Sequence, residues 1–79
     1  MFKNKTILIT GGTGSFGQAC IKYLVKNYNL KKIIIFSRDE NKQYEMKKKF
    51  PQNNIRFFLG DIRDKERLTM AMKDVHYVI

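Results

Sequence analysis

Four of the five glycines in this 79-residue chain lie between Gly11 and Gly17, in the sequence TGGTGSFG. Glycines at such spacings allow a tight turn, bring the main chain close to a phosphate and let a helix pack closely on a sheet. A β-branched run precedes the stretch and a helical pattern follows it, so the context predicts a loop that binds a dinucleotide pyrophosphate at a helix N-terminus. The alternative is a glycine-rich turn without a ligand. The residues assigned to cofactor binding here are Gly11, Thr13, Gly14, Ser15, Phe16 and Gly17.

A second group of candidate ligands follows the apolar run KIIIFS. Domains that prefer NAD usually have an acidic residue at this point, which binds the ribose 2′-hydroxyl. This chain has Ser37 and Arg38, with Lys42 four residues further on. A hydroxyl donor and two cations suit a 2′-phosphate, which favours NADP over NAD, although both basic residues are also compatible with an ordinary solvated surface. Asp39 and Glu40 keep an NAD site open, but we interpret them as helix N-terminal residues, where the helix dipole favours acids.

A third candidate is the segment GDIRD after the next apolar run. The carboxylate of Asp61 can accept a hydrogen bond from an adenine amino group, and Ile62 can pack on the ring. The alternative is a solvated acid in a turn.

Short apolar runs alternate with helical patterns along the whole chain. The expected strands are Thr6 to Thr10, Lys32 to Ser37, Ile55 to Gly60 and the beginning of a fourth in the final HYVI. The expected helices run from Ser15 to Tyr28, from a Ser37-x-x-Glu40 capping box to about Phe50, and from a cap at Asp64 through Leu68, Ala71, Met72 and Val75. The apolar face of the first helix is predicted to hold Phe16, Cys20, Ile21, Leu24 and Tyr28. This order, β-α-β-α-β-α-β, predicts an α/β fold, the N-terminal half of a doubly wound parallel-sheet (Rossmann) NAD(P)-binding domain.

Composition narrows the class of protein. The chain is 43% hydrophobic, which suits one small core, and no apolar run is as long as a membrane span or a signal peptide requires. Together with a single cysteine, Cys20, this indicates a cytoplasmic chain. His76 has no metal-ligand partners at suitable spacing, so no metal site is expected. The net charge of +9 leaves a nucleic-acid-binding module open, with Arg56, Phe57 and Phe58 as a stacking surface, but the basic residues are spread over all the helices.

These segments together resemble a known family. The chain resembles the extended short-chain dehydrogenase/reductases, and within them the polysaccharide-biosynthesis group, in the segments TGGTGSFG, IIIFSRDENKQ, FFLGDIRDKERL and AMKDVHYVI. Within that group it is most similar to the inverting UDP-N-acetylglucosamine 4,6-dehydratases. These enzymes begin pseudaminic acid synthesis for flagellin glycosylation. The resemblance implies that Ser37, Arg38 and Lys42 meet the NADP 2′-phosphate, and that Asp61 and Ile62 lie beside adenine. Retaining dehydratases, dehydratases with 5-epimerase activity and epimerases would share the same residues.

The resemblance also implies a reaction. NADP⁺ takes a hydride from C4 of the hexose, water is lost across C5 and C6, and the hydride returns to C6 with C5 inverted. The family's catalytic Tyr-x-x-x-Lys pair is not identified here, because Tyr28/Lys32 and Tyr44/Lys48 match the spacing but not the expected structural context. We therefore expect a partial NAD(P)-binding domain, residues 1–79, that is inactive alone. The substrate domain and catalytic residues would lie further along a longer, homo-oligomeric enzyme that binds a nucleotide sugar and neither nucleic acid nor a membrane.

Overall fold

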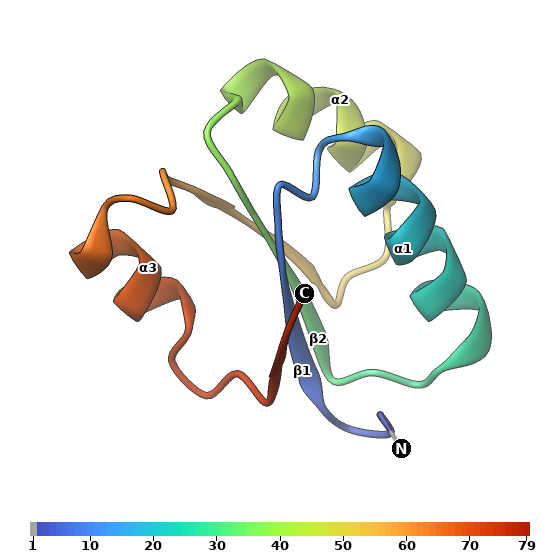
Figure 1. Ribbon diagram of the computed structural model, residues 1–79. Coiled ribbons are helices and arrows are strands. Elements are labelled where there is room, and N and C mark those ends of the chain that lie inside the picture. The colour runs from blue at the N-terminus through green and yellow to red at the C-terminus, as the bar shows by residue number, and fades with distance from the viewer. Residues whose placement is uncertain (1) are drawn as a thin grey trace.

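Four parallel strands form one sheet in the computed structural model, which describes residues 2–79 (Figure 1). The strands are β1 (Thr6–Thr10), β2 (Lys32–Ser37), β3 (Ile55–Leu59) and β4 (Tyr77–Val78). The helices are α1 (Ser15–Asn27), α2 (Glu40–Lys49) and α3 (Lys65–Ala71). The strand order is β3-β2-β1-β4, which is the order of the first half of a doubly wound fold, so the predicted fold class is confirmed.

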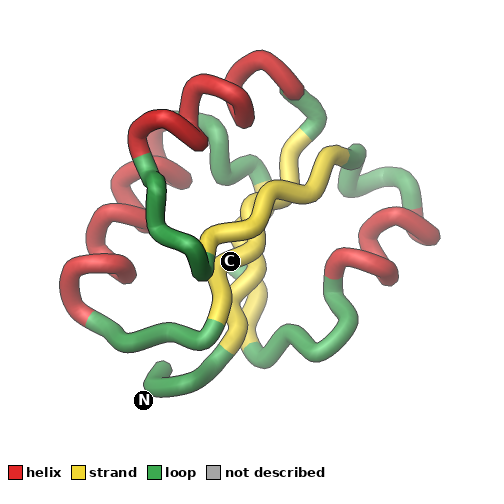
Figure 2. Tube along the Cα trace, turned by 180° about the vertical axis from the view of Figure 1, so that it is seen from behind, coloured by secondary structure: helices red, strands yellow, loops and turns green. Residues whose placement is uncertain are grey.

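Side chains alternate between the two faces of the sheet, as they must in extended chain. On one face Ile7, Ile9, Ile33 and Ile35 join residues of α1 and α2 in the larger core cluster. On the other face Leu8, Ile34 and Phe36 join Ala71 of α3. Figures 1 and 2 show the same division, with α1 and α2 together on one side of the sheet and α3 on the other. The continuous apolar runs in β1 and β2 follow from this, because both faces of these strands are covered.

The start of α2 differs from the sequence-based expectation. Its N-cap is Asp39, whose side chain accepts a hydrogen bond from the Lys42 amide at 3.0 Å. The predicted capping box was therefore wrong, because Ser37 is still in β2 and its hydroxyl is bonded to a side chain of α2. The interpretation of Asp39 and Glu40 as helix N-terminal residues is confirmed, as is the cap at Asp64, which accepts from the Arg67 amide.

Two residues assigned to apolar helix faces are exposed. Phe16 is 75% exposed, because the face of α1 that meets the sheet begins at Gly17 and continues through Ile21 and Leu24. Met72 is 41% exposed, because α3 ends at Ala71, before it. Cys20, in contrast, is partly buried and packs against the larger core cluster.

Candidate functional site

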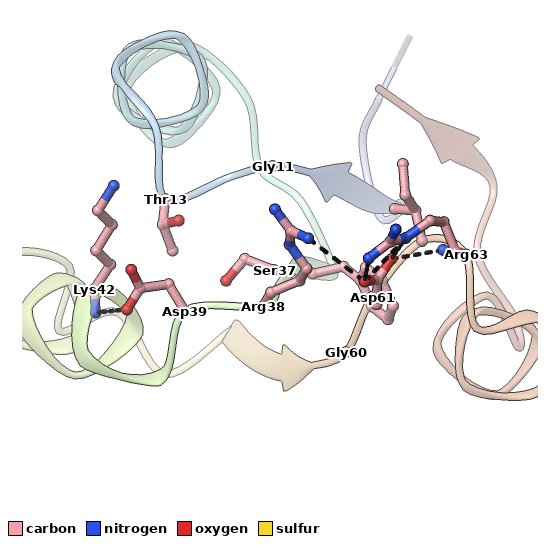
Figure 3. Close-up of a pocket in the computed structure, with 11 residues that line it drawn as sticks. Gly11, Thr13, Ser37, Arg38, Asp39, Lys42, Gly60, Asp61 and Arg63 are labelled. Atoms are coloured by element: carbon pink, nitrogen blue, oxygen red, sulfur yellow. Dashed lines mark hydrogen bonds and ion pairs between the residues drawn. The ribbon is translucent and has the colours of Figure 1, made fainter.

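A pocket of about 460 Å³ opens at the carboxyl ends of β1, β2 and β3 (Figure 3). Parallel α/β sheets bind their ligands at this edge, since the loops after successive strands meet there. The lining residues are Gly11, Thr13, Phe36, Ser37, Arg38, Asp39, Lys42, Gly60, Asp61, Ile62 and Arg63.

The pocket brings together most of the residues that the sequence singled out. Those that line it are Gly11, Thr13, Ser37, Arg38, Lys42, Asp61 and Ile62, from three separate segments. The remaining four, Gly14, Ser15, Phe16 and Gly17, form the N-cap and first turn of α1 and are not among the lining residues. Four lining residues were not assigned to the site: Phe36, Asp39, Gly60 and Arg63.

The glycine stretch has distinct backbone requirements at three positions. Gly11 has φ +63°, the left-handed conformation that favours glycine, so the chain turns sharply at the end of β1. Gly12 and Gly17 touch each other: a Cβ on Gly17 would lie 2.5 Å from the Gly12 Cα. The absence of a side chain at Gly17 therefore lets the first turn of α1 sit directly against the loop, and its absence at Gly12 lets the loop sit against Ile35 of β2.

The first turn of α1 presents unpaired main-chain amides. The first intrahelical bond runs from the Gln18 amide to the Gly14 carbonyl at 2.9 Å. The amides of Ser15, Phe16 and Gly17 thus have no acceptor within the helix, as at any helix N-terminus. The side chain of Gln18 also donates to the Thr13 carbonyl at 3.0 Å, which holds the loop against the helix. Amides and helix dipole together favour an anion at this end of α1.

Asp61 forms ion pairs with two arginines, Arg38 and Arg63, on the side of the pocket away from Thr13 (Figure 3). The Arg63 guanidinium lies 2.8 Å from Oδ2 of Asp61, and the Arg63 amide donates to Oδ1 at 2.8 Å. Arg38 makes a longer contact, 3.6 Å, with Oδ2. The hydrogen bonds from Arg63, more than the charge of Arg38, hold the pKa of the Asp61 carboxyl well below its usual range. Asp61 is therefore an ionised acceptor at neutral pH.

Aromatic packing forms the floor of the pocket. The Phe36 ring is fully buried and stacks with Phe58, with ring centroids 5.8 Å apart. A Cβ on Gly60 would lie 2.8 Å from the Phe36 ring, so the β3 loop crosses this ring only because residue 60 is glycine. Arg67 covers the Phe58 ring at 4.5 Å and donates twice to the Leu59 carbonyl, which fixes the end of β3. Phe58 is therefore already in contact with both Phe36 and Arg67.

Other candidates lie outside this pocket. Neither Tyr28/Lys32 nor Tyr44/Lys48 lines it, and Lys48 instead lies over the Tyr44 ring at 4.6 Å. Among residues 2–79 no three histidine, cysteine or acidic side chains gather closely enough to hold a metal ion. None of the helices between these residues is both long and apolar enough to cross a membrane. The Nδ1 atom of His76 accepts from the Thr6 amide at 3.0 Å, so this imidazole links the residue before β4 to the start of β1.

The chain matches a known protein family. The family model described as polysaccharide biosynthesis protein matches residues 7–79. The chain belongs to this family. It is 61% identical over 79 residues to a UDP-N-acetylglucosamine 4,6-dehydratase (inverting) of Campylobacter jejuni strain 81-176, a match that covers all of this chain and 24% of the relative. It is 49% identical over 81 residues to a UDP-glucose 4-epimerase of Rickettsia bellii, covering 99% of this chain and 24% of that relative. The chain thus spans about a quarter of the length of these relatives.

Two solved structures resemble the fold. Pen from Bacillus thuringiensis matches with a TM-score of 0.92 and 37% identity, over 98% of this chain and 25% of that chain. The dTDP-glucose 4,6-dehydratase of Bacillus anthracis, in complex with NAD, matches with a TM-score of 0.74 and 28% identity, over 94% of this chain and 25% of that chain. The resemblance to extended short-chain enzymes of polysaccharide biosynthesis is confirmed.

Proposed function

We propose that this chain is the NADP-binding part of a nucleotide-sugar 4,6-dehydratase that acts on UDP-N-acetylglucosamine and inverts C5. The reaction is supported by the 61% identity to the Campylobacter jejuni dehydratase along the whole chain. On this proposal residues 1–79 form part of an NAD(P)-binding domain. The catalytic residues and the substrate domain belong to other parts of a longer, cytoplasmic and homo-oligomeric protein.

NADP is supported as the cofactor because Ser37, Arg38 and Lys42 line one pocket with the glycine loop. A 2′-phosphate on the ribose would meet a hydroxyl and two cations there. Oδ1 of Asp39, the nearby acid, is already bonded to the Lys42 amide as a helix cap. The alternative cofactor is NAD, which the related Bacillus anthracis enzyme holds.

The remaining residues fit the other parts of the cofactor. The free amides at the start of α1 suit a pyrophosphate, and Gly11 and Thr13, just before them in the chain, line the pocket. The ionised carboxylate of Asp61 suits a hydrogen bond from the adenine amino group, and the side chain of Ile62, which is 60% exposed, suits an apolar contact with the ring. Because the Arg38 contact with Asp61 is long and solvent-exposed, a phosphate can displace it at small cost.

When bound, NADP⁺ supplies a hydride acceptor for C4 of the hexose and a hydride donor for C6. The residues of this chain bind and orient that cofactor, and none of them is assigned a catalytic role. We therefore propose that the chain alone does not turn over substrate, and that the nucleotide sugar is bound elsewhere in the longer protein.

Related reactions are the second candidate. The 49% identity to a Rickettsia UDP-glucose 4-epimerase supports an epimerase that uses the same cofactor-binding residues. A retaining dehydratase or a dehydratase with 5-epimerase activity would also share them. A nucleic-acid-binding module has less support, because Phe58 already packs against Phe36 and Arg67.

A chimera tests the proposal. Residues 1–79 replace the matching segment of the Campylobacter jejuni dehydratase, and in parallel that of the Rickettsia bellii epimerase. With UDP-N-acetylglucosamine and NADP⁺ the dehydratase chimera is expected to release a 4-keto-6-deoxy sugar with inverted C5, followed by proton NMR. The epimerase chimera should keep a smaller fraction of its parent enzyme's activity, because residues 1–79 are 49% identical to the epimerase and 61% identical to the dehydratase.

A more active epimerase chimera than dehydratase chimera would favour the epimerase as the enzyme to which this chain belongs. A dehydratase chimera that folds but works only with NAD⁺ would contradict the cofactor assignment while leaving the reaction class intact.

A further inference from the structure

Gln43 is a polar residue buried in the middle of α2, only 6% exposed. It does not line the pocket and it has no place in the cofactor contacts proposed above. Its side-chain nitrogen Nε2 lies 2.8 Å from the Ser37 hydroxyl oxygen, 3.2 Å from the Phe58 carbonyl oxygen and 3.4 Å from the Ser37 carbonyl oxygen. This one amide therefore connects α2 to the carboxyl ends of both β2 and β3.

The chemistry of these neighbours fixes the orientation of the amide. Two of the three are carbonyl oxygens, which can only accept hydrogen bonds, so the NH₂ group of Gln43 and not its oxygen must face them. The Ser37 hydroxyl oxygen consequently accepts from Gln43.

The hydroxyl proton of Ser37 then remains to be donated. A serine hydroxyl has one proton and two lone pairs. Gln43 occupies an acceptor position, and the hydrogen bonds of residues 2–79 give the hydroxyl no acceptor of its own. Ser37 lines the pocket, where its side chain is drawn between those of Arg38 and Asp39 (Figure 3). Its proton is thus available to a ligand oxygen, and an anionic phosphate oxygen is the strongest acceptor for it.

We propose that Gln43 is a specificity-determining positioning residue, which acts through Ser37 by keeping that hydroxyl a donor toward the 2′-phosphate of NADP. The inference rests on the proposed function, since it concerns the same site. A ribose 2′-hydroxyl gains less from a fixed neutral donor than a phosphate does, so the Gln43 contact favours NADP over NAD.

The test is a double-mutant cycle of Gln43→Met and Ser37→Ala, with dissociation constants for NADPH and NADH measured by calorimetry. The full chain is used, with the dehydratase chimera as a second host. Gln43→Met keeps the length of the side chain but removes the donor. We expect about tenfold weaker NADPH binding and less than a twofold change for NADH. In the Ser37→Ala background Gln43→Met should change NADPH binding less than twofold.

Gln52→Met is the matched control, because Gln52 is exposed in the loop before β3 and does not line the pocket. It should leave both affinities unchanged. Equal weakening of NADPH and NADH binding by Gln43→Met would overturn the inference, since a purely structural role affects both cofactors. So would a Gln43→Met effect that persists in full without the Ser37 hydroxyl.

A measurement on the unaltered residue covers the case in which Gln43→Met does not fold. The side-chain amide signals of Gln43 are followed by ¹⁵N NMR during titration with each cofactor. NADPH should shift them more than NADH, and Ser37→Ala should abolish the difference; equal shifts would overturn the inference. If the parent chain itself does not prefer NADPH, the proposed cofactor fails and this inference fails with it, an outcome distinct from a parent that discriminates without Gln43.

Discussion

At the scale of single residues, the charge state of Asp61 is the property with the clearest physical cause. Its two oxygens receive the guanidinium and the amide of Arg63, with Arg38 further away. Hydrogen bonds to the ionised form lower a carboxyl pKa, and a second cation adds to the effect. Asp61 therefore remains an acceptor far into the acid range.

This gives a titration that can be measured. Carbon-detected NMR should place the pKa of Asp61 below the ordinary 3.8, and Arg63→Ala should raise it toward that value. Arg38→Ala should raise it less, because the contact is 3.6 Å long. Since folding lowers the pKa of Asp61, its contact with Arg63 stabilises the folded chain above pH 3.8, and this stabilisation is lost as the pH falls further below that value. Arg56→Ala, outside the pocket, is the control; an unchanged Asp61 pKa in Arg63→Ala would contradict the account.

The sequence allowed part of this site to be predicted. Ser37, Arg38 and Asp61 were each assigned to parts of one cofactor, and they line one pocket at the edge where the loops after parallel strands meet. The roles of Gln43 and Arg63 were not predicted, because they depend on side-chain direction. One signal for Gln43 was present: it stands three residues before Met46 on the buried face of α2, where an apolar residue is usual.

At the scale of elements, the contact between the glycine loop and α1 determines where the free amides lie. Gly17 touches Gly12, and Gly12 in turn lies against Ile35 of β2. A side chain at either position would separate the helix from the sheet. The position of the free amides at the start of α1 thus depends on two glycines packed against each other.

Gly17→Ala is expected to lower the free energy of unfolding by about 2 kcal/mol, because its Cβ would lie 2.5 Å from the Gly12 Cα. Gly14→Ala is the matched control. The nearest atom to its Cβ is the Gly11 carbonyl oxygen at 3.5 Å, and we expect a loss of about 1 kcal/mol or less. Urea denaturation of both variants measures the difference. Equal losses would show that close helix packing is not what residue 17 provides.

Elements were easier to predict than the boundaries between them. The runs TILIT and KIIIFS are strands from the first residue to the last, since burial on both faces gives a continuous apolar signal. The predicted capping box was wrong because two polar residues, Ser37 and Asp39, precede α2, and only the fold decides which of them caps the helix. The prediction that Phe16 lies on the apolar face of α1 was wrong because the helix meets the sheet through Gly17, and a glycine gives no hydrophobic signal in the sequence.

At the scale of the whole molecule, the two faces of the sheet are covered unequally. Two helices and most of the core lie on one face, whereas the seven residues of α3 cover the other. The large apolar side chains that remain exposed near α3 and β4 are Met70, Met72, Tyr77, Val78 and Ile79. Strand β4 pairs with β1 at only two positions.

We therefore expect the isolated chain to be marginally stable, with a free energy of unfolding of about 3–5 kcal/mol or less. NADPH at a hundredfold excess over its dissociation constant should add about 2.7 kcal/mol and raise the Tm by about 10 °C or more. Scanning calorimetry with and without the cofactor measures both quantities. A sharp, cooperative, monomeric transition well above room temperature in the free chain would contradict the expectation of low stability.

On our proposal the pocket binds a dinucleotide, and Arg38 favours the form with a 2′-phosphate. Titration calorimetry of NADPH and NADH against the chain, Arg38→Ala and the control Arg56→Ala tests it most directly. We expect NADPH to bind at least about tenfold more tightly than NADH in the parent and in Arg56→Ala, with a much smaller ratio in Arg38→Ala. Equal affinities for the two cofactors in the parent, or no heat of binding for either in the folded chain, would contradict it.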